Sequence, residues 1–149
     1  MLMILKKLSK ADKDLITIFF KEVFTKEPWN DDWSDEQQLD LYIMDLIGNP
    51  NSMTLGFFED TKMVGLAMGC IRHWYEGTEY YIDELCISTN MQGKGIGTEF
   101  IKQIEGYMKT EGLSRIFLQT DRGMPAYEFY KKRGFEELQN HVSFVKSMS

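Results

Sequence analysis

The spacing of apolar positions in the first third of the chain favours helices. A short apolar run, Met3–Leu8, predicts an edge strand before them. In residues 11–25, and again from Ser34 to Gly48, apolar side chains recur every three or four positions, as on one face of a helix. Ser9 and Ser34 are expected to act as N-caps. The positions expected to face the core are Leu15, Ile18, Phe19 and Val23 in the first helix and Leu39, Ile43, Leu46 and Ile47 in the second.

The middle of the chain changes to patterns that are typical of β-strands. Runs at residues 53–59, 62–75 and 78–88 contain many apolar, β-branched and aromatic side chains. Turn residues separate the runs at 60–61 and 76–77. Three consecutive strands with tight connections predict an antiparallel meander.

The last third of the chain alternates between helix and strand signals. A glycine-rich segment at residues 90–97 runs into an amphipathic helix that Gly112 ends. Residues 116–118 form a short apolar run that predicts a buried strand. Another helix is expected to begin at Pro125, where proline suits the first turn, and to end at Gly134.

Residues 135–146 predict one or two closing strands. The whole order of elements predicts a mixed α/β fold, in which helices flank both faces of a mainly antiparallel central sheet. With 149 residues and no repeat, linker or low-complexity segment, the chain is expected to form a single domain over residues 1–149.

Charge narrows the range of partners. Seventeen Lys and Arg residues against 23 Asp and Glu residues give a net charge of −6. Such a surface repels phosphate backbones and anionic lipids, which argues against nucleic acid and membranes as partners. It suits a cationic small molecule better.

Cysteine and histidine are scarce. Two cysteines, Cys70 and Cys86, are too few for a disulfide scaffold, and two histidines give no cluster with metal-ligand spacing. No metal cofactor is therefore expected. The chain shows neither a signal-peptide pattern nor a run of about 20 apolar residues, so we expect a cytoplasmic protein.

The segment with the strongest chemical signal connects a strand to an amphipathic helix. It comprises Gln92, Gly93, Lys94, Gly95, Ile96, Gly97 and Thr98. Glycines let successive backbone N–H groups converge, and the first turn of the following helix adds unpaired N–H groups and a positive dipole end. Such a loop binds an anion, typically a phosphate or diphosphate.

Two common phosphate-binding motifs do not fit this loop. A Walker loop would need glycine where Ser88 stands and Ser or Thr where Gly95 stands. A dinucleotide-binding fingerprint that begins at Gly95 would need a third glycine where Phe100 stands, and a parallel strand before the loop.

What remains is a Gln-x-x-Gly-x-Gly loop after the third strand of a meander. Residues 83–87 with 92–97, and the Ala-Tyr-Glu-Phe-Tyr-Lys-Lys-Arg-Gly-Phe sequence at 126–135, are two motifs at a characteristic separation. With them, nearly the whole chain resembles the GNAT superfamily of acetyl-CoA-dependent N-acetyltransferases. The Glu-Pro-Trp sequence at 27–29 and Trp33 resemble the subset that includes aminoglycoside 6′-acetyltransferases.

This resemblance implies how acetyl-CoA would bind as the co-substrate. Its diphosphate would lie on the amides of residues 92–98, and its pantetheine arm would run as an extra strand along Leu85, Cys86 and Ile87. A backbone N–H near Cys86 or Ile87 would polarise the thioester carbonyl. Family members open that strand edge with a bulge and a splay from the next strand. Direct transfer of this kind needs no metal.

Transfer to an amine needs a base, because an alkylammonium has a pKa near ~10. Asp83 and Glu84 are the candidates in the predicted central strand. As neighbours they point to opposite faces, so only one can line the cleft. Parity groups Glu84 with Tyr80, Ile82 and Cys86 and groups Asp83 with Tyr81, Leu85 and Ile87, which leaves the choice open; we favour Glu84.

Two further roles follow from the resemblance. Tyr130 matches the tyrosine that protonates the coenzyme A sulfur in the family. Many relatives have an asparagine after the fifth strand that contacts coenzyme A, and this chain has none in residues 120–124, which puts contacts from that segment in doubt. Arg122 is instead expected to reach a phosphate of the co-substrate.

The acceptor site is expected to combine aromatic faces with acidic groups, an arrangement that suits a cation. The candidates for its walls are Trp29, Trp33, Trp74 and Tyr75, with Asp31, Asp32 and Glu76 near them. Solvated loops with tryptophans packed on the core are the alternative interpretation of the same residues.

The resulting hypothesis is an acetyl-CoA-dependent N-acetyltransferase that acts on a small cationic amine such as an aminoglycoside, a polyamine or an amino acid. The alternatives are a non-catalytic acyl-CoA-binding regulatory module, a phosphate-binding interaction domain, and an acetyltransferase for protein N-termini or lysines. Proteins of the superfamily that the chain resembles often form homodimers. The predicted closing strands at 135–146 are a candidate interface for such a dimer.

Overall fold

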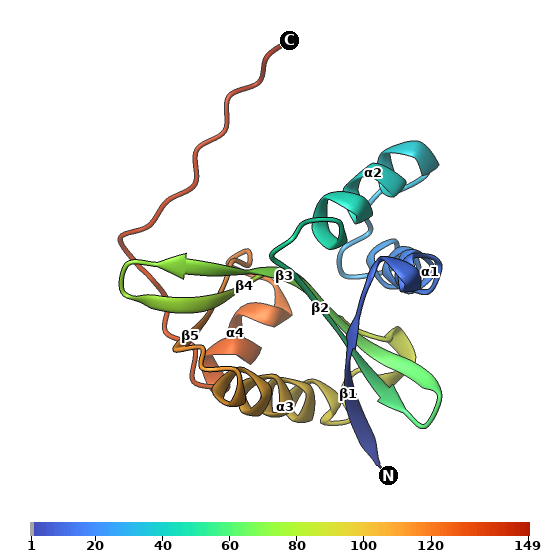
Figure 1. The fold of residues 1–149 in the computed structure, drawn as a ribbon. Coiled ribbons are helices and arrows are strands. Elements are labelled where there is room, and N and C mark those ends of the chain that lie inside the picture. Colours follow the sequence, from blue (N-terminus) through green and yellow to red (C-terminus); the bar gives the residue numbers. More distant parts are fainter. Residues whose placement is uncertain (1) are drawn as a thin grey trace. The chain divides into compact units, whose positions relative to one another are not determined.

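The computed structural model describes residues 2–149, which divide into two compact units: one ends at Gln119 and the other is Thr120–Ser149. The first unit contains the sheet and helices α1, α2 and α3, and the second contains α4 (Figure 1). Each unit is described by itself below. No helix among residues 2–149 has the length and apolar character needed to cross a membrane.

The sheet has five strands in sequential order, from β1 at one edge to β5 at the other. The strands are β1 (Met3–Leu8), β2 (Ser52–Glu59), β3 (Lys62–Trp74), β4 (Gly77–Ile87) and β5 (Arg115–Leu118). The first three pairings are antiparallel, and only β4 and β5 run parallel. The predicted edge strand, the meander and the mainly antiparallel α/β sheet are therefore confirmed.

Helices cover both faces of the sheet (Figure 1). The helices α1 (Lys13–Phe24) and α2 (Glu36–Ile47) pack with residues such as Leu66 and Cys86 in one apolar cluster. On the opposite face, α3 (Ile96–Thr110) packs in a second cluster with residues such as Phe57 and Tyr80. Burial of these two apolar clusters is the main driving force for the fold of this unit.

The buried face of α1 agrees with the predicted one at Phe19 and Val23 and differs from it elsewhere. Leu15 and Ile18 are 44% and 66% exposed, whereas Ile16, Phe20 and Phe24 are buried. Apolar residues occupy more than one face of this helix, so periodicity alone allows two orientations. The observed orientation buries two large phenyl rings, which removes more apolar surface from water.

Helix starts follow side-chain capping. Ser9 caps a short 3₁₀ helix, Lys10–Asp12, that precedes α1: its Oγ accepts from the Ala11 N–H at 3.2 Å, and the Asp12 carboxylate accepts from the Ser9 N–H at 2.9 Å. Asp35, not Ser34, caps α2, because its carboxylate accepts from the Gln38 N–H at 3.1 Å. A carboxylate at this position also interacts favourably with the helix dipole.

In the second unit, α4 (Pro125–Lys132) begins at proline and is followed by Gly134 with φ +92°, as expected. The closing strands predicted for residues 135–146 are wrong: no residue of this segment is in a strand, and Phe144 and Val145 are 93% and 97% exposed. Alternating apolar and polar residues favour a strand only where a partner strand accepts from its N–H groups and donates to its C=O groups. This unit contains no strand to pair with.

Candidate active site

A β-bulge places the two candidate carboxylates. Met68 on β3 pairs with Glu84 on β4, but the next residue of β3, Gly69, pairs with Ile82. Asp83 is therefore the extra residue of a bulge. Gly69 makes this possible, because a Cβ there would lie 2.0 Å from the Tyr81 carbonyl oxygen.

The bulge also changes which side chains share a face of β4. Tyr80 and Ile82 pack in the cluster on the α3 face, whereas Cys86 packs in the cluster on the α1–α2 face. Glu84 bonds to a residue of α2, so it shares its face with Cys86 but not with Tyr80 and Ile82. The grouping of Glu84 with Tyr80 and Ile82 predicted from sequence was wrong, because the inserted residue Asp83 reverses which side chains of β4 point to each face of the sheet.

Glu84 is half-buried and accepts a hydrogen bond at 3.0 Å from the hydroxyl of Tyr42, which lies on α2. Burial raises the pKa of Glu84 to about 7; the Tyr42 hydrogen bond opposes this, and the charges of Asp31 and Asp83 add to it. A carboxyl group with a pKa near neutrality can take a proton and release it again.

Asp83 has a different environment. Its side chain is largely exposed. Partial desolvation raises the pKa of its carboxyl group overall, and the nearby Arg72 guanidinium opposes this shift. Of the two neighbouring acids, Glu84 alone is bonded to a second element of the fold.

The edge of β4 beyond Ile82 is open. Parallel pairing with β5 runs only from Glu79↔Arg115 to Ile82↔Leu118. For Leu85–Ile87 no strand of the described chain pairs on the β5 side, while β3 pairs on the other side. This stretch therefore has the backbone groups that an added extended segment would need. Cys86 itself is 3% exposed, and burial raises the pKa of its thiol, which makes it a poor nucleophile.

The glycine-rich loop comes soon after the end of β4. After the 3₁₀ helix Thr89–Met91, the Gln92 side-chain amide donates to the Ile87 carbonyl at 3.1 Å and ties the loop to the end of β4. Gly93 and Gly95 have φ values of +78° and +80°, which favour glycine strongly. Gly95 is the N-cap of α3.

The remaining loop residues belong to the first turn of α3. Ile96 is buried and anchors the turn, whereas Gly97 has an ordinary helical conformation. Lys94 and Thr98 are exposed. By helix geometry, the N–H groups of this first turn point out of the end of the helix, so they and the dipole can serve an anion. The loop predicted from sequence is thus present with two glycines, not three, in the left-handed conformation.

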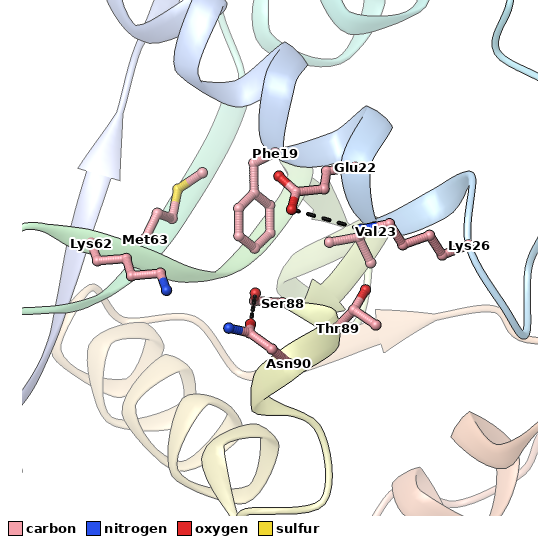
Figure 2. A pocket seen from close by; sticks show the side chains of 9 residues that line it. All are labelled: Phe19, Glu22, Val23, Lys26, Lys62, Met63, Ser88, Thr89 and Asn90. Atoms are coloured by element: carbon pink, nitrogen blue, oxygen red, sulfur yellow. Dashed lines mark hydrogen bonds and ion pairs between the residues drawn. The ribbon is translucent and has the colours of Figure 1, made fainter.

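A hollow of about 360 Å³ lies beside the end of β4, on the α1 side. Figure 2 shows Ser88, Thr89 and Asn90 on one side of it and Phe19 and Val23 of α1 on the other. Lys62, Met63, Glu22 and Lys26 complete the lining, and Lys26 pairs with Glu22 at 3.8 Å. None of the candidate catalytic residues and none of residues 92–98 lines this hollow.

The aromatic residues proposed for the acceptor site lie in two places. Trp29 and Trp33 are half-buried against the α1–α2 cluster, and Trp33 stacks on Tyr42 with ring centroids 5.3 Å apart. Trp74 and Tyr75 are exposed and lie at the β3–β4 turn. At about 3.3 Å per strand residue, that turn is roughly 20 Å from Glu84 along β4. Of these four residues, Trp33 contacts Tyr42, the residue that donates to Glu84, whereas Trp29 packs on Phe24 of the same cluster.

The second unit contains Tyr130 and Arg122. The Tyr130 ring on α4 makes edge contacts with Phe129 and Phe135 at 5.5 Å and 5.4 Å. The Arg122 guanidinium forms an ion pair with Glu137. The roles of these two residues toward the co-substrate stay predictions.

Two residues that matter for the site were not identified from sequence: Tyr42 and Gly69. Tyr42 sits among apolar positions of a helix, and its partner is 42 residues away. Gly69 stands inside an apolar strand run, where an isolated glycine is a known signal for a bulge or a close backbone approach. Among residues 2–149 there is no group of three or more His, Cys, Asp or Glu side chains that could hold a metal ion.

Comparison with known proteins agrees with this geometry. The sequence model of the "Acetyltransferase (GNAT) family" matches residues 13–135. A Bacillus subtilis (strain 168) protein described as "Uncharacterized protein YdhI" is 32% identical over 99 residues, which are 60% of this chain and 61% of that protein. The matching region thus spans less than two thirds of that relative.

Solved structures show the same fold. An aminoglycoside acetyltransferase, meta-AAC0020, from an uncultured soil metagenomic sample and in complex with sisomicin, has a TM-score of 0.73 at 23% identity, with 99% of this chain and 97% of that chain covered. "A possible acetyltransferase" from Clostridium difficile 630 has a TM-score of 0.80 at 16% identity over the whole of both chains. AAC(6')-Iy, in complex with a CoA-containing bisubstrate analog, has a TM-score of 0.72 at 15% identity, and the match covers 99% of each chain.

The chain is an acetyltransferase by class, with the mixed α/β fold described above. It belongs to the GNAT family, because the family's sequence model covers most of its length. The resemblance inferred from the glycine-rich loop and the 126–135 motif is confirmed at this level.

Proposed function

We propose that this protein transfers the acetyl group of acetyl-CoA directly to a primary amine of a small cationic acceptor. The observation that carries the proposal is the position of Glu84: a half-buried carboxyl group just before the open stretch Leu85–Ile87 of β4, whose end is tied to the glycine-rich loop. Family membership supports the reaction class.

The loop and the open edge support a site for acetyl-CoA. Gly93 and Gly95 in the left-handed conformation and the N-terminus of α3 would hold the diphosphate, with Lys94 as a mobile counter-charge. The pantetheine amides would pair with the backbone of Leu85–Ile87. A backbone N–H of this stretch would stabilise the charge that develops on the thioester oxygen.

Glu84 would act as the general base. A carboxylate accepts the proton of the acceptor ammonium, directly or through one water, and the free amine then attacks the thioester carbonyl carbon. The C–N bond forms, the C–S bond breaks, and the thiolate would take a proton from the hydroxyl of Tyr130. The proton that the acylated nitrogen loses would restore Tyr130 through solvent, and Glu84 would release its proton to solvent before the next turnover. Because Cys86 is buried and unreactive, the proposal includes no acyl-enzyme.

Charge and aromatic groups near Glu84 support a cationic acceptor. Asp31 and Asp83 act electrostatically on Glu84, so three carboxyl groups contribute negative charge in this region. Trp33, which stacks on the Tyr42 that donates to Glu84, provides an aromatic group nearby, and Trp29 packs in the same apolar cluster. Aminoglycosides, polyamines and amino acids share the required cationic amine, and the sisomicin complex of meta-AAC0020 adds weight to the first class.

The test combines binding with turnover. Calorimetry should show acetyl-CoA binding, and coenzyme A release should appear with at least one amine of a panel containing sisomicin, spermidine, amino acids and a peptide with a free N-terminus. Binding without turnover on any amine would support a non-catalytic acyl-CoA-binding module instead. Absence of acetyl-CoA binding would overturn the proposal altogether.

A further inference from the structure

We propose that Tyr42 is a positioning residue for the transfer reaction: its hydroxyl holds the Glu84 carboxyl group in one orientation and stabilises its ionised form. This inference rests on the proposed function, in which Glu84 is the base. Tyr42 belongs to none of the motifs that define the family resemblance. The inference comes from the contact between α2 and β4.

The hydroxyl of Tyr42 is held in place by its ring. The ring stacks on Trp33, with centroids 5.3 Å apart and planes 17° apart, and makes an edge contact with Phe20 at 5.9 Å. Phe20 is 1% exposed and contacts Trp33 as well, at 5.6 Å. Three mutually packed rings leave little freedom to the tyrosine, so the direction of its O–H donor is preorganised.

Trp33 supports Tyr42 through its ring alone. The Trp33 indole N–H is buried and has no hydrogen-bond acceptor among the residues that the structure describes. Loss of the Trp33 ring should therefore loosen Tyr42 without removing any hydrogen bond that the structure shows.

The groups around Glu84 explain why a donor is needed there. Asp31, from the segment between α1 and α2, and Asp83, on β4, both oppose ionisation of Glu84, as does burial. Cys86 on β4 and Met68, opposite on β3, present no positive charge. Tyr42 on α2 is the group whose contact favours the carboxylate, because a hydrogen bond to an ionised acceptor is stronger than one to a neutral acceptor.

Tyr42 can keep this role over the working pH range. Burial and the Glu84 carboxylate raise the pKa of the Tyr42 hydroxyl well above its ordinary value, so Tyr42 stays a donor at neutral and moderately alkaline pH. It is therefore unsuited to act as the base itself.

The deciding variant is Tyr42→Phe, which keeps the ring and removes the hydroxyl. We expect the acidic limb of the kcat/KM profile to move upward by about one pH unit, so that activity at pH 6.5 falls about tenfold and approaches wild type near pH 9. A variant that merely lost packing would be impaired at every pH. Trp33→Ala should shift the limb in the same direction by a smaller amount.

Tyr80→Phe is the matched control. Tyr80 is fully buried and donates to the Met53 carbonyl at 3.0 Å, so the substitution removes a hydrogen bond of similar length from the core on the other face of the sheet. Tyr80→Phe should lower the melting temperature and leave the acidic limb of the kcat/KM profile unchanged.

A second readout separates this inference from the proposed function. The Glu84 carboxyl carbon, assigned in ¹³C NMR of the full chain by its absence in Glu84→Gln, reports the titration midpoint without any turnover. An upward shift in Tyr42→Phe but not in Tyr80→Phe supports the inference, and equal midpoints in Tyr42→Phe and wild type overturn it. Full activity of Glu84→Gln would instead overturn the base assignment, whatever the midpoints.

Discussion

Gly69 on β3 pairs with Ile82 on β4, one position before the bulge residue Asp83, and its α-carbon lies so close to β4 that a side chain does not fit. A Cβ on Gly69 would meet the Tyr81 carbonyl oxygen at 2.0 Å and the Ile82 α-carbon at 2.9 Å. Both are backbone atoms of a paired strand. This close approach fixes the bulge, and the bulge turns Glu84 toward α2.

Gly69→Ala should therefore disturb both stability and the site. We expect a loss of about 2–3 kcal/mol in the free energy of unfolding, because β4 must move to relieve the clash. Activity should fall as well, since Glu84 moves with β4. Urea denaturation and turnover measure the two effects. Wild-type values for both would contradict the role given to the bulge.

The glycine-rich loop gives a separate prediction. Gly93→Ala and Gly95→Ala introduce side chains at φ values near +80°, at a cost of about 1 kcal/mol each for the loop conformation, although no atom lies within 4 Å of the new methyl group. We expect acetyl-CoA to bind about fivefold more weakly to each variant, measured by calorimetry.

Gly106→Ala is the control for the loop variants. Gly106 lies inside α3, its φ value is not positive, and the space around it is equally open. Alanine there should raise stability by about 0.5–1 kcal/mol and leave acetyl-CoA affinity unchanged. Equal affinities for all three variants and wild type would mean that the loop does not hold the diphosphate.

Burial of Glu84 also predicts a pH-dependent stability. Its pKa is about 7 in the folded protein against 4.5 ordinarily, so between these values the folded state holds a proton that the unfolded chain has lost. The free energy of unfolding contributed by this group is then largest below pH 4.5 and is lost as pH rises through 7.

Glu84→Gln removes this effect, because glutamine is neutral at every pH and still accepts a hydrogen bond from Tyr42. The melting temperature should rise by about 4 °C at pH 8 and change little at pH 4.5. Calorimetric scans over this range provide the measurement. A difference that does not depend on pH would show that Glu84 has an ordinary pKa.

Glu79 and Arg115 join β4 to β5 where the two strands still pair. The Glu79 carboxylate is 3% exposed and accepts from Arg115 Nε at 2.7 Å, and Arg72 Nε lies 3.9 Å away. Glu79→Gln should lower the free energy of unfolding by about 1–2 kcal/mol, because it leaves the Arg115 charge poorly paired. Denaturant titration tests this.

The exposed pair Lys13–Asp40 gives the comparison, since both side chains are in contact with solvent. Asp40→Asn should cost less than about 0.5 kcal/mol. Similar losses for the two substitutions would contradict the larger contribution to stability expected of the buried Glu79 carboxylate.

The elements of the fold were largely predictable, because each depends on local signals. Apolar periodicity located the three helices of the first unit and the meander, and glycines at 93, 95 and 112 marked loop and helix ends. The position of the glycine-rich loop was predictable as well, because Gly93 and Gly95 allow backbone angles that other residues rarely adopt.

The predictions failed where contacts between residues far apart in the sequence determine the local structure. Nothing local in residues 78–88 reveals the bulge at Asp83, since it depends on Gly69 in another strand. The buried face of α1 depended on how much aromatic surface the sheet could cover. The hydrogen bond between Tyr42 and Glu84 joins elements 42 residues apart, and no spacing rule predicts it.

The most direct test of the account is the rate of acetyl transfer by Glu84→Gln and by Asp83→Asn at pH 7.5, with the amine identified by the panel. The two substitutions make the same chemical change at adjacent residues. The account predicts that Glu84→Gln lowers kcat about 100-fold or more with unchanged acetyl-CoA affinity, whereas Asp83→Asn changes it less than about threefold. A wild-type rate for Glu84→Gln, or a large loss confined to Asp83→Asn, would contradict it.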